Sequence, residues 1–116
     1  MTMLREFQTI GHDLFIAGLN NSHSGNMSVR LNRMMAITRS GSMLHRLDYD
    51  DIVETLIDGE DAASARASRE RPVHRAIYLQ TSAQAIVHAH PPQLIALSFF
   101  TDQFSPVDAE GRYFFP

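Results

Sequence analysis

The chain has 116 residues, of which 44 % are hydrophobic and 20 % are charged, and its formal net charge at pH 7 is −3. This length predicts one domain with a small core, and the balance of charge favours neither nucleic acid nor an acidic membrane surface as a partner. The absence of cysteine excludes disulfides and thiolate metal sites. The N-terminus does not resemble a signal peptide, and no apolar run approaches the ~18 residues of a membrane span, so we expect a cytoplasmic protein.

The first part of the chain predicts a helix followed by a hairpin. Apolar residues at intervals of three or four predict the helix, and alternating apolar residues predict the two strands. These elements span residues 3–17, 27–31 and 34–38. A glycine at position 18 suits the end of the helix, and Asn32-Arg33 suits the turn between the strands.

The second part alternates strands and helices. A β-branched segment and a short apolar run predict strands, and a proline in the first turn predicts the start of each helix. The strands are expected at 51–57 and 85–90, the helices from Pro72 to about residue 80 and from Pro92 to Phe99, and loops at 60–71 and 108–111. This order predicts an α/β layered fold with a mixed or antiparallel sheet.

His88 and His90 are two residues apart at the end of a predicted strand. Residues i and i+2 of a strand lie on the same side, so both imidazoles would face one space. Two neutral imidazoles are suitable ligands for zinc. On this spacing alone, two polar residues at the exposed end of a strand remain an equally good interpretation.

Other polar residues gather before the second predicted helix and at loop ends. Glu70 suits a metal ligand or a general base, although a solvated charge is the commoner role, and His74 one turn later suits a packing or hydrogen-bonding role. Three pairs of residues at loop ends offer backbone N–H groups, hydroxyls, an amide and a guanidinium for an anion such as phosphate. They are Gly25-Asn26, Ser40-Gly41 and Ser68-Arg69. Taken one at a time, each pair is more typical of a turn.

The order of these motifs resembles that of the class II aldolase/adducin family, especially its members of the L-fuculose-1-phosphate aldolase type. The motifs are Gly25-Asn26-Met27-Ser28, Thr38-Arg39-Ser40-Gly41, Ser68-Arg69-Glu70 with His74, and His88-Ala89-His90-Pro91. The resemblance implies a three-layer α/β/α fold with a central mixed, largely antiparallel sheet. It also implies that residues 1–116 are one class II aldolase/adducin-like domain whose C-terminal part is missing.

The resemblance further implies a zinc-dependent aldehyde-lyase. His88 and His90 would be zinc ligands, with a third histidine beyond residue 116, and Glu70 would be the catalytic acid/base and a metal ligand when substrate is absent. Gly25, Asn26, Ser40, Gly41, Ser68 and Arg69 would surround the substrate phosphate. The implied reaction is retro-aldol cleavage of a sugar phosphate, such as a ketose 1-phosphate, through an enediolate. The implied assembly is a homotetramer with active sites at its subunit interfaces.

Three alternatives share this scaffold. A pentulose-phosphate 4-epimerase would use the same cleavage followed by re-addition. An aldolase or decarboxylase with a carboxylate substrate is favoured by Arg69, which stands where the family has a second serine and keeps a preference for an anion. A non-catalytic, adducin-like interaction module is the third alternative. The presence of Glu70, His88 and His90 argues against it, because such a module has no need of metal-facing side chains.

Overall fold

The structure is a computed structural model that describes residues 2–114. Its helices are α1 (Met3–Ile16), α2 (Arg71–Gln80), α3 (Pro92–Ser98) and α4 (Ala109–Phe114), and its strands are β1 (Asn26–Leu31), β2 (Met34–Thr38), β3 (Ile52–Leu56) and β4 (Ala85–His88). Three short 3-10 helices are η1 (Leu44–Arg46), η2 (Tyr49–Asp51) and η3 (Ser64–Arg66). No helix in the described part of the chain is both long enough and apolar enough to cross a membrane.

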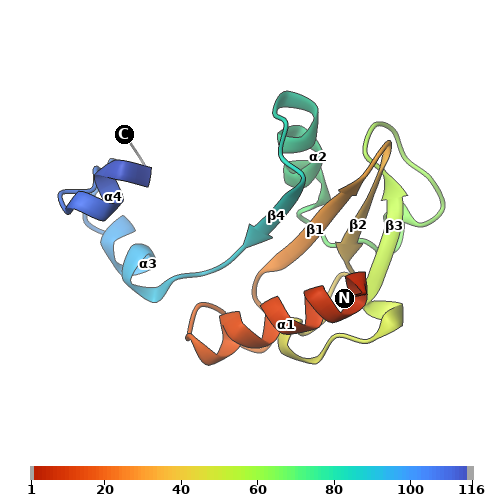
Figure 1. Cartoon of the computed structure of the whole chain (residues 1–116), viewed down its shortest axis with the longest axis horizontal. Helices are drawn as coiled ribbons and strands as arrows, with labels where there is room; N and C mark the ends of the chain where they lie inside the picture. Colours follow the sequence, from red (N-terminus) through yellow and green to blue (C-terminus); the bar gives the residue numbers. More distant parts are fainter. Residues whose placement is uncertain (1, 115–116) are drawn as a thin grey trace.

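The four strands form one sheet in the order β3-β2-β1-β4, and all three neighbouring pairs are antiparallel (Figure 1). In the register of β1 and β4, Asn26 lies opposite His88. Because neighbouring strands run in opposite directions, the start of β1 lies at the same end of the sheet as the ends of β2 and β4. That end therefore gathers residues that are far apart in the sequence.

Helices cover both faces of the sheet. On one face, Phe7 of α1 packs in a buried cluster with Met27 of β1 and with Leu44 and Leu47. On the other face, Tyr78 of α2 packs in a cluster with side chains of β2 and β3 and of the segments that follow β3, namely Met35, Ile37, Val53, Ile57 and Ala67. Successive residues of a strand face opposite sides, so Met27 faces α1 and its neighbour Ser28 faces α2. The expected three-layer α/β/α fold is confirmed, with only antiparallel pairing among the described strands.

Local signals account for both ends of α1 and for the turn between β1 and β2. Thr2 caps α1 by accepting a hydrogen bond from the Arg5 backbone N–H, and the chain leaves the helix through Gly18 at a φ of 72°. Asn32 has a φ of 62° in the hairpin turn, as its short polar side chain permits. The expected helix over residues 3–17 is confirmed to within one residue.

Two boundaries differ from the sequence prediction. The strand expected over 85–90 ends at His88, so His90 lies just outside the sheet. The loop predicted over 108–111 is wrong, because α4 begins at Ala109. The carboxylate of Asp108 accepts a hydrogen bond of 2.7 Å from the Gly111 backbone N–H, which satisfies a free donor of the first turn. Asp108, a residue type that is common in turns, therefore caps the start of α4, which explains why the sequence pattern predicted a loop.

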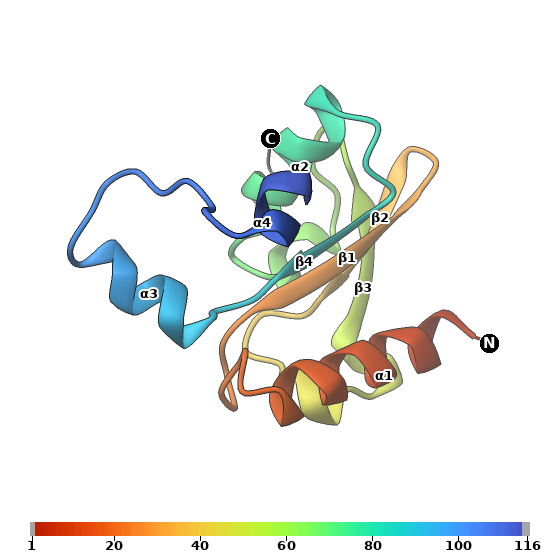
Figure 2. The same cartoon turned by 60° about the vertical axis from the view of Figure 1, so that its left-hand side comes forward.

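The segment after β4 stands apart from the sheet in Figure 1. Figure 2 shows the chain running from the end of β4 into α3 and then through a long loop to α4. Large apolar side chains of this segment lie in solvent, with Phe99 80 % and Phe100 87 % exposed. Phe114, the last residue of α4, is also exposed, at 64 %.

Candidate active site

An open cleft of about 710 Å³ lies at the end of the sheet where β1 begins and β4 ends. Separate segments of the chain line it. The lining residues are Asn21, His23, Ser24, Gly25, Asn26, Arg39, Ser40, Gly41, Ser42, Ser68, Arg69, Glu70, His88 and His90. Every residue that the sequence analysis selected for a metal or anion site lies on this one surface.

The two histidines are held as a pair at the mouth of the cleft. Their rings stack with centroids 4.9 Å apart and planes at 30°, so both imidazoles lie on the same side of the chain. His88 is the last residue of β4 and half-buried, and its Nδ1 lies 3.2 Å from Nδ2 of Asn26. The backbone N–H of His90 donates to the carbonyl of Leu19 at 2.8 Å and to Oδ1 of Asn20 at 3.2 Å. Hydrogen bonds to the loop after α1 therefore fix the backbone between the two rings.

Gly25 allows this loop to approach β4 closely. Its φ is 82°, and a Cβ placed on it would lie 2.6 Å from the carbonyl oxygen of His88 and 2.7 Å from Nδ2 of Asn20. Such distances are far below van der Waals contact, so only glycine fits here. The close approach sets the position of His88 relative to Asn26.

We expect Gly25→Ala to destabilise the fold by more than Gly41→Ala. Gly41 has a similar φ of 77° but no atom within 4 Å of an added Cβ, so its replacement costs only the left-handed strain of about 1–2 kcal/mol. Gly25→Ala adds the clash with backbone and a buried amide. The free energies of unfolding in urea measure both variants. Equal losses would show that the approach to His88 is not tight.

Glu70 lies between η3 and α2, in a segment that hydrogen bonds tie to the end of β2. The Ser68 backbone N–H donates to the Thr38 carbonyl at 2.9 Å, and the Ser40 N–H donates to the Arg66 carbonyl at 3.0 Å. Glu70 is the N-cap of α2, and its own N–H donates to Oγ of Ser68 at 3.2 Å. Its carboxylate makes no capping hydrogen bond, so the side chain is available to the cleft.

A chain of buried polar groups runs from the cleft to the core between the sheet and α2. Oδ1 of Asn26 is hydrogen-bonded to Nε2 of His74. Nδ1 of His74 lies 2.6 Å from the Ser28 hydroxyl, which lies 2.7 Å from the Tyr78 hydroxyl. Burial, with a smaller contribution from the nearby imidazole of His88, lowers the pKa of His74 from 6.5 to about 4. His74 is therefore neutral at physiological pH.

A hydrogen-bonding role was predicted for His74, but not the Ser28 hydroxyl that bonds to it, nor the Tyr78 hydroxyl that bonds to Ser28. Ser28 was detectable as the polar residue between Met27 and Val29 on a strand, and Tyr78 as the residue one turn after His74 on the same helix face. Asn20, 8 % exposed, was also overlooked, and its Nδ2 has no hydrogen-bond partner within residues 2–114.

Two arginines line the cleft, and they differ in their partners. Arg39 is largely neutralised by Asp51, with Nη2 and Oδ1 2.6 Å apart. Arg69 is exposed and forms no ion pair with a carboxylate of residues 2–114. Since Ser40, Gly41 and Ser68 lie beside it on the same surface, this wall of the cleft suits an anion.

The donor set of the cleft suits zinc but is incomplete. Two imidazoles and a carboxylate are ligand types that zinc takes, and His88, His90 and Glu70 all line the cleft. Within residues 2–114, however, no three His, Asp or Glu side chains lie close enough together to hold a metal ion. The described part of the chain thus offers two imidazoles and a carboxylate in one cleft.

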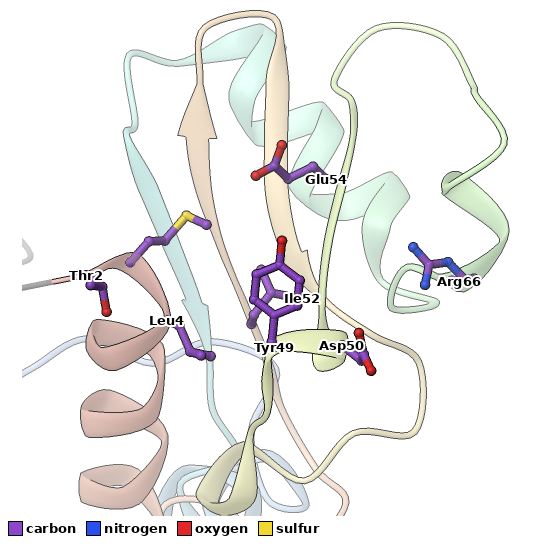
Figure 3. Close-up of a pocket in the computed structure, with 8 residues that line it drawn as sticks. Thr2, Leu4, Tyr49, Asp50, Ile52, Glu54 and Arg66 are labelled. Atoms are coloured by element: carbon purple, nitrogen blue, oxygen red, sulfur yellow. The ribbon is translucent and has the colours of Figure 1, made fainter.

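A second cavity, of about 670 Å³, opens between the start of α1 and β3 (Figure 3). Figure 3 shows Thr2 and Leu4 on one side of it, Tyr49, Ile52 and Glu54 in the middle and Arg66 on the far side. Its lining contains no histidine among residues 2–114. The cleft at the end of β4 is therefore the better candidate for an active site.

Paired histidines, a glutamate and polar groups suited to an anion thus line one cleft of an α/β/α fold. Residues 5–115 match the Class II Aldolase and Adducin N-terminal domain. The chain belongs to this family. The family is generally metal-dependent, and its related enzymes are lyases.

Individual relatives differ in the reactions that their names give. The chain is 32 % identical over 94 residues to a 3-oxo-tetronate 4-phosphate decarboxylase of Cupriavidus necator, covering 80 % of this chain and 43 % of that protein. It is 35 % identical over 97 residues to a methylthioribulose-1-phosphate dehydratase of Acidiphilium cryptum, covering 81 % and 46 %. The crystal structure of L-fuculose-1-phosphate aldolase from Thermus thermophilus superposes with a TM-score of 0.86 and 40 % identity, covering 96 % of this chain and 58 % of that one. The chain thus spans about half the length of these relatives.

Proposed function

We propose that this chain carries most of the active site of a zinc-dependent aldehyde-lyase that cleaves a sugar phosphate, such as a ketose 1-phosphate. The supporting observation is that His88, His90 and Glu70 line one cleft together with Ser40, Ser68 and Arg69. The family and its L-fuculose-1-phosphate aldolase relative support the same reaction. A third nitrogen ligand would come from outside residues 1–116, and the active assembly would be a cytoplasmic homotetramer.

Each part of the cleft has a role in this reaction. His88 and His90 would hold zinc, which when bound polarises the oxygen atoms of the substrate. Glu70 removes or returns the proton on the carbon next to the carbonyl, as a general base and acid. The phosphate is bound by Gly25, Asn26, Ser40, Gly41, Ser68 and Arg69 through backbone N–H groups, an amide, hydroxyls and a guanidinium.

A carboxylate substrate is the second candidate, with decarboxylation or carboxylate aldol cleavage as the reaction. The exposed guanidinium of Arg69 in the cleft, which has no carboxylate partner within residues 2–114, favours it, because arginine binds a carboxylate through two parallel hydrogen bonds. The similarity to a decarboxylase of a phosphorylated oxo acid supports this candidate too. Turnover of a ketose 1-phosphate and of a 3-oxo acid phosphate, measured side by side, separates the two reactions.

Zinc content and turnover test the proposal directly. The 116-residue chain is compared with a longer chain that continues the same reading frame through a further histidine. We expect the shorter chain to bind zinc at least about 10–100-fold more weakly and to show negligible retro-aldol activity, because one ligand of three is absent. Elemental analysis and aldehyde release measure the two properties. Stoichiometric zinc and equal turnover in the shorter chain would contradict the proposed ligand set.

A further inference from the structure

The side-chain amide of Asn26 connects two imidazoles, that of His88 in the cleft and that of the buried His74. Its Nδ2 lies 3.2 Å from Nδ1 of His88 in the cleft, and its Oδ1 is hydrogen-bonded to Nε2 of His74 beneath it. An amide nitrogen can only donate and an amide oxygen can only accept. Nδ1 of His88 is therefore an acceptor and Nε2 of His74 a donor, so both neutral rings carry their proton on Nε2.

The hydrogen bonds deeper in the core have the same donor-to-acceptor direction. Nδ1 of His74 accepts from the Ser28 hydroxyl at 2.6 Å, and the Ser28 oxygen accepts from the Tyr78 hydroxyl at 2.7 Å. Four hydrogen bonds thus run from Tyr78 to His88, and every donor in them has an acceptor. All the groups between the cleft and the core are buried, with exposures of 5 % for Asn26, 1 % for Ser28, 1 % for His74 and 2 % for Tyr78. Water has little access to replace any of these hydrogen bonds.

If the same hydrogen bonds ran in the opposite direction, from His88 to Tyr78, one donor would be left without an acceptor. Nδ1–H of His88 would then donate to the oxygen of an Asn26 amide rotated by half a turn. Asn26 would donate to His74, His74 to Ser28, and Ser28 to Tyr78. The proton of the Tyr78 hydroxyl would be left without an acceptor among residues 2–114, since Ser28 is its hydrogen-bond partner there. An unpaired donor in a buried place is unfavourable. The direction from Tyr78 to His88 is therefore preferred when no metal is bound.

We propose that the buried chain Tyr78–Ser28–His74–Asn26 fixes the tautomer of His88 and reverses as a unit when His88 binds a metal through Nε2. This inference rests on the metal site proposed above. A ligating nitrogen must be free of its proton, and in the observed direction Nε2 of His88 carries one. Binding through Nε2 moves the proton of His88 to Nδ1, which obliges Asn26 to turn and His74 to change tautomer. Ser28, His74 and Tyr78 are thus positioning residues for a metal ligand that they do not touch.

Long-range proton–nitrogen NMR spectra of 15N-labelled imidazoles test this proposal in the 116-residue protein. Without metal, we expect His74 and His88 each to show one tautomer with the proton on Nε2. Asn26→Ala removes the bridging amide, so the nitrogen shifts of His88 should move towards the average of the two tautomers. Gln84→Ala removes an exposed amide that lies outside the buried chain, so it is the matched control and should leave both tautomers unchanged. A proton on Nδ1 of His88 in the metal-free protein, or no change in Asn26→Ala, would overturn the proposal.

Addition of zinc to the extended chain and to its Asn26→Ala variant tests the reversal, because the 116-residue chain lacks one of the proposed ligands. In the unmodified protein both His74 and His88 should change to the Nδ1–H tautomer at the same zinc concentration. In Asn26→Ala only His88 should change. A change at His88 with none at His74 in the unmodified protein would show that the chain does not reverse as a unit. If zinc changes neither ring, the proposed metal site fails, while the metal-free spectra still decide whether the buried chain sets the tautomer.

Discussion

Replacing Glu70 with Gln is expected to lower retro-aldol turnover by about 10²–10⁴-fold, the usual contribution of a general acid or base. Gln keeps the size of the side chain but cannot take a proton from carbon. The Glu70 side chain makes no capping hydrogen bond to α2, so the fold should be retained. The measurement is aldehyde release from a ketose 1-phosphate, made in whichever chain, short or extended, shows turnover.

A partial reaction separates this role from a loss of metal. Exchange of the carbon-bound proton of dihydroxyacetone phosphate with deuterated water requires only the base, the metal and the bound substrate. We expect Glu70→Gln to abolish this exchange while zinc content is unchanged. Glu54→Gln, at an exposed position on β3 outside the cleft, is the control and should retain full exchange. Exchange at the normal rate in Glu70→Gln would show that Glu70 is not the base. Loss of zinc from this variant would show instead that its main role is to bind the metal.

The parts of the site that were predictable from the sequence lie close together in the chain. The spacing of His88 and His90 follows from the two-residue period of a strand, and the position of Glu70 follows from the proline that starts α2. The structure places both features in one cleft. Local periodicity and helix-start signals depend on neighbouring residues alone, which explains why they can be read without the fold.

The contacts that orient the histidines were not predictable in the same way. Asn26 meets His88 because β1 pairs with β4 in one particular register, across 62 residues of sequence. The partners of His74 depend on which face of the sheet α2 covers. Pairing register and layer packing are properties of the whole fold. Sequence patterns indicated a hydrogen-bonding role for His74 but could not identify the groups that fulfil it.

The largest expected effect on stability comes from the burial of His74 as a neutral ring. Its pKa is about 4 in the folded protein, against 6.5 for an ordinary histidine, because burial disfavours the charged form and the nearby His88 adds to this effect. Between these two values the unfolded chain binds a proton that the folded protein does not. The free energy of unfolding is therefore fully retained above pH 6.5 and falls as the pH decreases towards 4.

At about 1.4 kcal/mol for each pKa unit, this single group should remove about 3 kcal/mol between pH 6.5 and pH 4. Urea unfolding at several pH values measures the loss, and His74→Gln, which cannot titrate, is the comparison. The two proteins should differ in slope over this range. The pKa of Asp61 is held below its ordinary 3.8 by hydrogen bonds from the Thr55 hydroxyl and the Leu56 N–H, so its protonation acts at lower pH. Parallel curves for the two proteins from pH 4 to 7 would show that His74 accepts a proton in the folded state at its ordinary pKa, and hence that its site is open to water.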